Sequence, residues 1–319
     1  MDNYSIHKLQ KDEFNLLIPI MRDCFGMDIN VKYFEWKFKN NPAGFVEGYY
    51  AKHEDGEIAA YYGVIPEVYV INGEKRVIYQ SCDTMTHSNH RRRGLFQKLA
   101  IHCYENLKKE QKLFIIGFGG GQSTPGFIKF GWKEIFKIKY YFYPRQFRIF
   151  NTCKFFEVVE IKNFKEIEHL TLKSNENAEI HSHKNADIFS WRVSNPLNNY
   201  KTVAIKDENQ IYNSYITFYE QEDKIILFDY YIGDYQLGKQ VFNYLKSLLN
   251  KRQKGIVSFI QENSPLSKTV VTYNFISNPF SKGPLSSKTP FIFFASDNEL
   301  HQFNDKTKWL INSFDHDAI

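Results

Sequence analysis

Hydrophobic positions in the first 40 residues recur at helical spacing. The pattern predicts one helix over residues 12–25 and a second over residues 31–39, the latter ended by Asn40-Asn41-Pro42. The apolar positions of the first are Phe14, Leu17, Ile18, Met21 and Phe25. Pro19 falls inside that stretch, and we expect it to bend or split the helix.

The pattern then changes to runs typical of strands. Two turn signals, Glu54-Asp55-Gly56 and Asn72-Gly73, separate the first three runs, which predicts an antiparallel meander. Beyond them, Leu99, Cys103 and Leu107 form an apolar stripe at intervals of four, as expected of a helix. The predicted elements are strands 48–52, 58–70 and 77–86, helix 94–109, strand 113–118, helix 123–129 and strand 135–143.

The second half repeats this plan. Phe34-Glu35-Trp36-Lys37 has a counterpart in Phe189-Ser190-Trp191-Arg192, and the later elements follow in the same order. They are strands 211–219 and 224–232, helix 235–250, strand 255–260 and a segment from 264 to 275. Repetition at half the chain length predicts a duplicated domain, divided as 1–145 and 146–319. The alternative is chance similarity in a chain with 17% aromatic residues.

Composition narrows the classes of function. The net charge of +5 is spread along 319 residues, so no nucleic-acid partner is expected, whereas a polyanionic small ligand suits it. Four cysteines, at 24, 82, 103 and 153, are too far apart for a zinc site or a disulfide framework, and no metal is expected. The chain shows no signal peptide and no apolar run of about 20 residues, so we expect a cytoplasmic protein without membrane contact.

The stretch Arg91-Arg92-Arg93-Gly94-Leu95-Phe96 lies between a predicted strand and a predicted helix. A helix N-terminus presents free N–H groups and the positive end of the helix dipole, and the arginines add cations. This combination favours a phosphorylated ligand. An arginine run alone is commonly a solvated basic face, so the elements that follow it decide the interpretation.

The ordered set of strand, Arg-x-x-Gly, helix, strand, short helix and Phe130-Gly131-Trp132 resembles the GNAT superfamily of acyl-CoA-dependent N-acyltransferases. The resemblance covers about residues 48–143, and the duplication extends it weakly over the rest. It implies a mixed α/β fold, with a mostly antiparallel central sheet flanked by helices and a probable tandem duplication. It also implies coenzyme A as co-substrate and acyl transfer to a primary amine.

Carried over residue by residue, Arg91-x-x-Gly94 matches the loop that binds the coenzyme A pyrophosphate. Residues 122–132 match the second family motif, and the strand end before the loop would pair with the pantetheine amides. The resemblance therefore assigns coenzyme A binding to Met85, Thr86, His87, Arg91, Arg92, Arg93, Gly94, Leu95, Phe96, Ser123 and Phe127. The corner before the second-half helix instead reads Ile232-Gly233-Asp234, and an aspartate there would repel phosphate, so one acyl-CoA site is expected.

Two positions depart from the family pattern. Phe96 stands where a small residue is usual, so the local packing must differ. Phe127 aligns with the tyrosine that often protonates the leaving thiolate, which phenylalanine cannot do. Water, the product ammonium or another side chain would then protonate the thiolate, or it leaves unprotonated, since a thiol pKa near about 8.5 makes it a tolerable leaving group.

Asp83 is the candidate catalytic base. A carboxylate inside an apolar strand run needs a partner or a cleft, and partial burial would raise its pKa toward the range useful for taking a proton from an ammonium. The alternative is a structural aspartate at a strand bulge or paired with an arginine. His87 and His90 are further candidates, more readily explained as loop residues near coenzyme A, and Cys82 is expected in the core.

Trp36 borders the expected acceptor cleft and could stack on a sugar or base, although its repeat at Trp191 favours a packing role. The chain's length and two halves resemble acyltransferases of nucleotide-linked amino sugars, in particular a dTDP-linked 3-amino-3,6-dideoxyhexose destined for surface polysaccharide. Alternatives are N-acetyltransferases of antibiotics, polyamines or peptides, a non-catalytic acyl-CoA sensor, or a transferase using charged tRNA. A monomer or a homodimer is expected.

Overall fold

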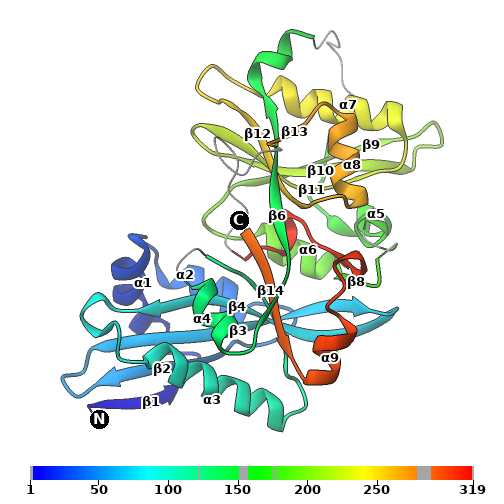
Figure 1. The fold of residues 1–319 in the computed structure, drawn as a ribbon. Helices are drawn as coiled ribbons and strands as arrows, with labels where there is room; N and C mark the ends of the chain where they lie inside the picture. Colours follow the sequence, from blue (N-terminus) through cyan, green and yellow to red (C-terminus); the bar gives the residue numbers. More distant parts are fainter. Residues whose placement is uncertain are drawn as a thin grey trace.

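A computed structural model describes residues 3–120, 123–150, 157–174, 176, 178–278 and 289–317. Their 15 strands form one continuous sheet, with helices packed on its faces (Figure 1). The main path runs β1-β2-β3-β4-β5-β14-β6-β12-β11-β10-β9-β7. The expected mixed α/β fold with a mostly antiparallel sheet is confirmed.

The N-terminal half follows the predicted order closely. Its strands are β1 (Tyr4–Lys8), β2 (Glu47–His53), β3 (Ile58–Ile71), β4 (Glu74–Thr86), β5 (Phe114–Phe118) and β6 (Lys133–Pro144). Its helices are α1 (Leu17–Phe25), α2 (Val31–Phe34), which continues as a π-helical turn (Glu35–Lys39), α3 (Leu95–Lys109) and α4 (Thr124–Lys129). β2, β3 and β4 form the expected antiparallel meander.

Pro19 moves the start of the first helix. Residues Phe14–Leu16 form a 3₁₀ turn, and α1 begins only at Leu17. Pro19 thereby falls in the first helical turn. Backbone N–H groups in that turn have no acceptor inside the helix, so a proline there costs no helical hydrogen bond. The helix predicted from residue 12 is thus split, as the proline indicated.

The C-terminal half carries the other elements. Its strands are β7 (Val158–Glu160), β8 (Ile180–Ser182), β9 (Tyr200–Lys206), β10 (Tyr212–Glu220), β11 (Lys224–Ile232), β12 (Gly255–Gln261), β13 (Ile276–Ser277), β14 (Thr289–Ala295) and β15 (Trp309–Leu310). Its helices are α5 (Glu168–Lys173), α6 (Ala186–Val193), α7 (Tyr235–Ser247), α8 (Pro265–Thr272) and α9 (Asp297–Gln302).

Corresponding helices cover corresponding strands in the two halves. α3 buries Leu99 and Leu107 in a core shared with β2 and β3, and α7 buries Phe242 and Leu245 in a core shared with β9, β10 and β11. Each half pairs its strand before the long helix in parallel with the strand after it, β4 with β5 and β11 with β12. This agreement of order and pairing supports the proposed duplication.

The halves share strands across the predicted division at residue 145. β6 is long enough to join both, pairing with β14 at one end and with β12 at the other (Figure 1). β14, from the part assigned to the second domain, lies between β5 and β6 in the sheet of the first. Residue 145 therefore divides the repeat proposed from the sequence. It does not divide the structure into two separate sheets, because β6 continues from one half into the other and β14 lies in the sheet of the first half.

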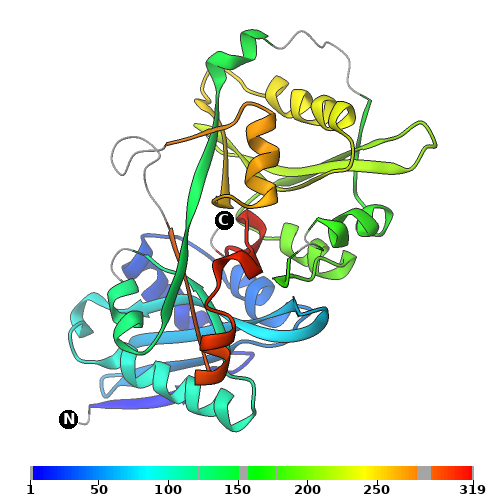
Figure 2. The same cartoon turned by 45° about the vertical axis from the view of Figure 1, so that its right-hand side comes forward.

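The chain's last described segment runs from the N-terminal half to the boundary with the C-terminal half, where Figure 2 shows it in red. Among the described residues, no helix is both long and apolar enough to cross a membrane. Cys24, Cys82 and Cys103 are free thiols, and Cys82 and Cys103 are buried as core residues, whereas Cys153 lies outside the described part of the chain.

Candidate active site

A cavity of about 500 Å³ opens where β4 and β5 diverge. The two strands pair in parallel at Tyr79–Ile115 and Gln80–Ile116, and the cavity lies between the residues that follow on each strand. Divergence leaves backbone groups of both strands without each other as partners, so an extended ligand can bond to them. Asp83 lines this cavity.

A β-bulge sets the position of Asp83. The β3–β4 register passes from Gly63–Cys82 to Tyr61–Met85, so Asp83 and Thr84 together face one residue of β3. Asp83 adopts a φ of 46°, a left-handed conformation that costs a non-glycine residue about 1–3 kcal/mol. Bulges re-aim side chains, and this one directs the carboxylate of a half-buried strand into the cavity.

A buried lysine connects Asp83 to a second carboxylate. Lys37 Nζ lies 2.8 Å from Asp83 Oδ2, an ion pair, and donates hydrogen bonds to Asp317 Oδ2 at 2.9 Å and to the Tyr33 hydroxyl at 3.1 Å. The Lys37 side chain is 1% exposed, and each carboxylate is 10% exposed. One cation therefore faces two carboxylates in a site with little water.

The electrostatics shift the pKa values of the two carboxylates in opposite directions, upward for Asp83 and downward for Asp317. Burial raises its pKa; Lys37 opposes the shift and the nearby Asp317 adds to it. For Asp317, burial also acts to raise the pKa, but Lys37 and His316 hold it below its ordinary value. The pair carries one excess negative charge when both are ionised, so Asp83 can accept a proton from a bound ammonium at a pKa better matched to that task.

The C-terminal segment supplies groups that the sequence did not point to. Asp317 and His316 both line the cavity with Asp83. His316 stacks on Phe118 of β5, with ring centroids 4.4 Å apart, and burial lowers its pKa to about 4, so it is neutral near pH 7. Nothing in their local sequence marks these residues, because only the return of the chain from β14 through β15 brings them to the cleft.

The sequence patterns assign no role in the site to Lys37, although its neighbours carry a signal. Lys37 follows Trp36 in the repeated aromatic motif, inside the helix predicted over residues 31–39. A lysine flanked by Trp36 and Phe38 in a helix that buries both neighbours must itself be buried or paired. That reasoning would have predicted a carboxylate partner without identifying which one.

Both halves of the chain contribute to the cavity wall. Apolar side chains come from α1 and the residues after it, from β5, α4 and β14, and the loop after α6 adds two amides and a leucine. The apolar group is Met21, Phe25, Met27, Phe118, Phe127, Leu197 and Ile292, and the amide residues are Asn195 and Asn198. A ligand here can meet an apolar wall on one side and amide groups on the other.

The arginine loop lines a second cavity, of about 310 Å³, together with Thr86, with Gly126 of α4 and with Phe130 directly after α4. All three arginines are exposed. Gly94, at a φ of 72°, forms the N-cap of α3, and the first helical hydrogen bond runs from Lys98 N to Gly94 O. The amides between them have no acceptor inside the helix, as an anion site requires.

The two cavities adjoin along the same elements. Thr84 lines the first and Thr86 the second, two positions apart on β4, and α4 contributes Phe127 to the first and Gly126 to the second. A ligand with an anionic end and an extended arm can therefore reach from the arginine loop to Asp83.

The two phenylalanines that depart from the family pattern pack together. The Phe96 ring lies 5.2 Å from that of Phe127 and 5.7 Å from that of Phe130. Phe96 thus fills the gap between α3 and α4, while its amide remains at the helix N-terminus. Phe127 also faces the Asp83 cavity, and Ser123 lines it at the start of α4.

Three predicted site residues lie elsewhere. Trp36 stacks on Trp191 at 5.5 Å, each indole N–H donates to the other's backbone carbonyl, and neither lines the Asp83 cavity. This supports the packing role rather than acceptor stacking. The side chain of Met85 is in the core, so only its backbone could serve a ligand, and the His87 ring faces Glu57 and Asp23.

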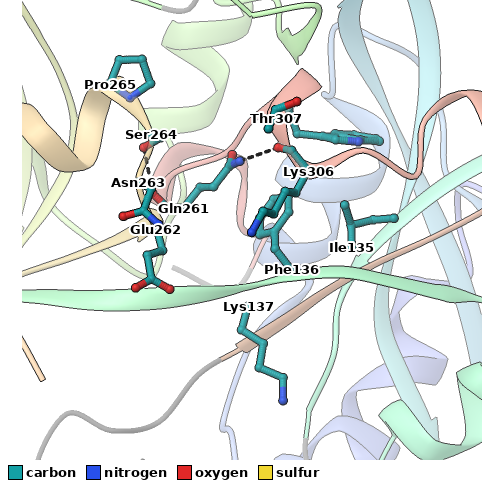
Figure 3. A pocket seen from close by; sticks show the side chains of 11 residues that line it. Ile135, Phe136, Lys137, Gln261, Glu262, Asn263, Ser264, Pro265, Lys306 and Thr307 are labelled. Carbon is teal, nitrogen blue, oxygen red and sulfur yellow. Dashed lines mark hydrogen bonds between the residues drawn. The ribbon is translucent and has the colours of Figure 1, made fainter. Parts of the chain in front are cut away.

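A further cavity, of about 430 Å³, lies between β6, β12 and the residues before β15 (Figure 3). Gln261 Nε2 donates to Lys306 O across its wall at 2.8 Å. Neither the arginine loop nor Asp83 borders it, so it lacks the combination of anion site and base found in the N-terminal half.

Comparison with known proteins shows a family match for the N-terminal part of the chain and a shared fold for most of it. Residues 5–135 match the family model described as an acetyltransferase (GNAT) domain. No curated protein matches the chain. A probable N-acyltransferase of unknown function from Enterococcus faecalis V583 superimposes with a TM-score of 0.72 at 8% identity, over 92% of this chain and 73% of that one.

Two other solved structures share the fold. A GCN5-related N-acetyltransferase from Anabaena variabilis has a TM-score of 0.67 at 12% identity, over 91% of this chain and 72% of that one. Saccharomyces cerevisiae N-myristoyltransferase with bound myristoyl-CoA has a TM-score of 0.62 at 9% identity, over 92% and 79%. With the family match over residues 5–135, these structures show that the chain has the fold expected from the resemblance, and they name no nucleotide-sugar acceptor.

Proposed function

We propose that this chain, whose residues 5–135 match the GNAT domain, binds acyl-CoA along β4 and transfers the acyl group to a primary amine beside Asp83. The observation that carries the proposal is the pair of adjoining cavities, one bordered by the arginine loop and one by a carboxylate of raised pKa.

In this assignment the coenzyme A pyrophosphate binds the free amides of Leu95 and Phe96, and Arg91, Arg92 and Arg93 neutralise its charge. Gly94 allows close approach of the backbone. The pantetheine amides pair with the backbone of β4 at Met85 and Thr86, and the thioester reaches the cavity past Ser123 and Phe127. The His87 side chain belongs to another cluster and takes no part.

Asp83 removes the proton from the acceptor ammonium, and the free amine attacks the thioester carbonyl. The C–S bond breaks and coenzyme A leaves as the thiolate. Tyr33 is a phenol that lines this cavity, but burial raises its pKa above its ordinary value. Proton transfer from Tyr33 to the thiolate would therefore be unfavourable, because the thiolate is a weaker base than the Tyr33 phenolate. With a thiol pKa near about 8.5, the thiolate departs without a protein acid and is protonated by water or the product ammonium.

For the acceptor we propose an amino group of a nucleotide-linked amino sugar. The amides of Asn195 and Asn198 on the cavity wall suit a hydroxylated acceptor, and the chain's positive charge suits its diphosphate. The finer assignment, to a dTDP-linked sugar of a surface polysaccharide, rests on the overall resemblance of the chain.

A thiol-release assay tests the function. The chain is given acetyl-CoA or hydroxybutanoyl-CoA together with a panel of dTDP-amino sugars, polyamines, aminoglycosides and peptides. We expect acceptor-dependent thiol release with an amino sugar, abolished in Asp83→Asn. Release with another amine class would keep the enzyme and change the acceptor, and no release with any amine, despite coenzyme A binding, would favour a sensor.

A further inference from the structure

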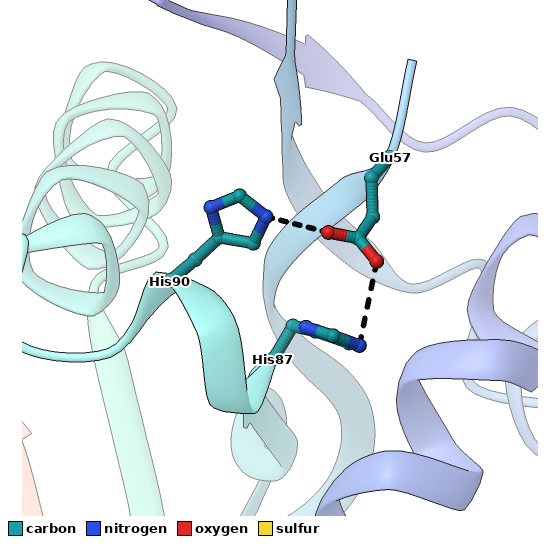
Figure 4. Close-up of side chains that lie close together, drawn as sticks. All are labelled: Glu57, His87 and His90. Atoms are coloured by element: carbon teal, nitrogen blue, oxygen red, sulfur yellow. Dashed lines mark hydrogen bonds and ion pairs between the residues drawn. The ribbon is translucent and has the colours of Figure 1, made fainter. Parts of the chain in front are cut away.

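Three side chains outside the active site converge at the turn before the arginine loop. Glu57 lies just before β3, and His87 and His90 flank a single 3₁₀ turn after β4 (Figure 4). Their ligand atoms all lie within 4.8 Å of one another. We infer that Glu57, His87 and His90 form a binding site for a divalent transition-metal ion, with the donor set of Zn²⁺.

The donors point at one spot. Glu57 Oε2 lies 2.6 Å from His90 Nε2, and its Oε1 lies 3.4 Å from His87 Nε2, so both rings present the same nitrogen to one carboxylate (Figure 4). Two imidazoles and a carboxylate are the protein ligands of many four-coordinate zinc sites. An ion needs only small side-chain movements to replace the protons that now mediate these contacts.

Neighbouring groups orient the ligands. The Tyr4 hydroxyl lies 2.9 Å from His90 Nδ1, and its oxygen can accept a hydrogen bond from Nδ1–H when Nε2 binds an ion. The Nδ1 atom of His87 accepts a long contact of 3.4 Å from Asn89 N–H. Metal binding through Nε2 would place the His87 proton on Nδ1, so the contact from Asn89 N–H would be lost. That contact is long, at 3.4 Å, so its loss costs little.

Asp23 lies beside this set on a different element, α1. Its Oδ1 lies 3.7 Å from His87 Nε2, and its two oxygens accept hydrogen bonds from Ser88 N–H and Ser88 Oγ. The ligand atoms that meet within 4.8 Å belong to Glu57, His87 and His90, so a water would take the fourth position of the ion.

The burial suits entry and retention. The side chain of His90 is 6% exposed and that of His87 17%, so the ring positions are fixed by packing, while Glu57 at 39% leaves a path from solvent. An ion here would tie the start of β3 to the residues that immediately precede Arg91. The spacing of the cysteines led us to expect no metal. The proposed site departs from that expectation, because its ligands are two histidines and a glutamate rather than cysteines.

Calorimetric titration of the chelator-treated full chain with ZnCl₂ tests the site. We expect one bound Zn²⁺ per chain in the wild type. Affinity should fall roughly tenfold or more in Glu57→Gln and in the double variant His87→Gln/His90→Gln. His102→Gln is the matched control, since His102 is an exposed histidine on α3 whose neighbours are Lys98 O and the Tyr49 ring, and it should bind as the wild type does.

Thermal unfolding supplies a second readout. Zn²⁺ should raise the unfolding temperature of the wild type and His102→Gln but not of Glu57→Gln. The Glu57 side chain is 39% exposed, so its substitution should leave the chain folded. If the histidine double variant does not fold, Glu57→Gln and Tyr4→Phe carry the comparison. Absence of stoichiometric Zn²⁺ binding in the wild type, or equal affinity in Glu57→Gln, would overturn the inference.

Discussion

The two halves of this chain contain the same strand-to-helix corner, but the helix N-terminus is open to an anion in the first half and capped by a carboxylate in the second. In the N-terminal half, Gly94 caps α3 without a side-chain hydrogen bond, and three arginines surround the free amides. In the C-terminal half, Asp234 caps α7, and its Oδ1 accepts hydrogen bonds from Gln236 N and Leu237 N at 2.8 and 3.0 Å. The carboxylate of the second half already occupies the position that a phosphate would take in the first.

The clefts next to these corners differ in the same way. β11 and β12 also pair in parallel and then diverge, but Ile311–Asp315 lies against their diverging ends. Asn312 Nδ2 donates to Asp229 Oδ1 on β11 at 2.7 Å, and Ser313 Oγ accepts from Phe259 N on β12 at 2.9 Å. The chain's own segment bonds both strands where the first half leaves its cleft open.

Each half also buries an aspartate three residues before the end of the corresponding strand. Asp229 is fully buried and is bonded by Lys184 and Tyr215 as well as Asn312, both at 2.7 Å. Asp83 has one lysine and faces a cavity. The same scaffold thus gives a structural aspartate where every oxygen is bonded and a candidate base where one side stays open.

The segment that fills the second cleft also completes the first site. Past Asp315, whose backbone oxygen accepts from Gln80 Nε2 of β4 at 2.9 Å, the chain places His316 and Asp317 at the Asp83 cavity. Consecutive residues of one segment therefore fill the cleft of the second half and line the cavity of the first. The comparison teaches that the halves differ by what occupies the cleft, while their frameworks agree.

Exchanging each aspartate for asparagine should separate the two roles most strongly. In Asp83→Asn we expect turnover to fall ~10²–10⁴-fold with coenzyme A affinity retained, because the base is lost and the anion site is untouched. Asp229→Asn leaves the buried Lys184 without its charge partner, and it should instead cost about 3–5 kcal/mol of the free energy of unfolding. Steady-state kinetics and chemical denaturation measure these effects. Wild-type turnover in Asp83→Asn would remove Asp83 from the mechanism.

Charge reversal at the two helix corners should give the next largest difference. Arg91→Glu or Arg93→Glu should weaken coenzyme A binding by roughly tenfold to a hundredfold, the loss of a charge-assisted contact plus repulsion of phosphate. Asp234→Ala should leave that affinity unchanged and cost about 1 kcal/mol of stability through the lost N-cap. Calorimetry and thermal unfolding report the two quantities. Equal coenzyme A affinity in all three variants would contradict the assignment of the arginine loop.

The pH dependence of kcat/KM should identify the pair of carboxylates at the open cleft. Burial raises the pKa of Asp83, and only its deprotonated form takes a proton, so the rate should rise with pH through that raised value. Asp317 adds to the raised pKa, and Asp317→Asn should therefore move the rising limb to lower pH. A limb that stays in place, or moves upward, would show that Asp83 is not the group observed.

The stacked tryptophans at the junction of the halves should give the smallest effect. Trp36→Phe removes one indole hydrogen bond, to the carbonyl of Trp191, and should lower the free energy of unfolding by about 1 kcal/mol. Trp191→Phe should behave alike, because its own bond to Trp36 O is the mirror image. Michaelis constants for both substrates should not change. A raised acceptor KM in Trp36→Phe alone would restore its predicted contact with substrate.

Sequence patterns predicted the elements near the site well, because each is local. Turn residues predict the meander, and apolar spacing predicts the helix after the arginine loop together with the glycine at its start. The bulge at Asp83 and its partner Lys37 depend on cross-strand register and on a contact between distant segments, which no spacing encodes. β14 is similar, since a buried apolar strand can join any open edge, and its insertion between β5 and β6 is decided by the whole fold.

The stoichiometry of coenzyme A binding tests the central claim most directly. Calorimetric titration of the intact chain should give one coenzyme A per chain, and Arg91→Glu should weaken that binding by roughly tenfold to a hundredfold while Asp234→Ala preserves it. Two binding events per chain, or one event whose affinity is unchanged in Arg91→Glu and falls in Asp234→Ala, would contradict a single open site in the N-terminal half.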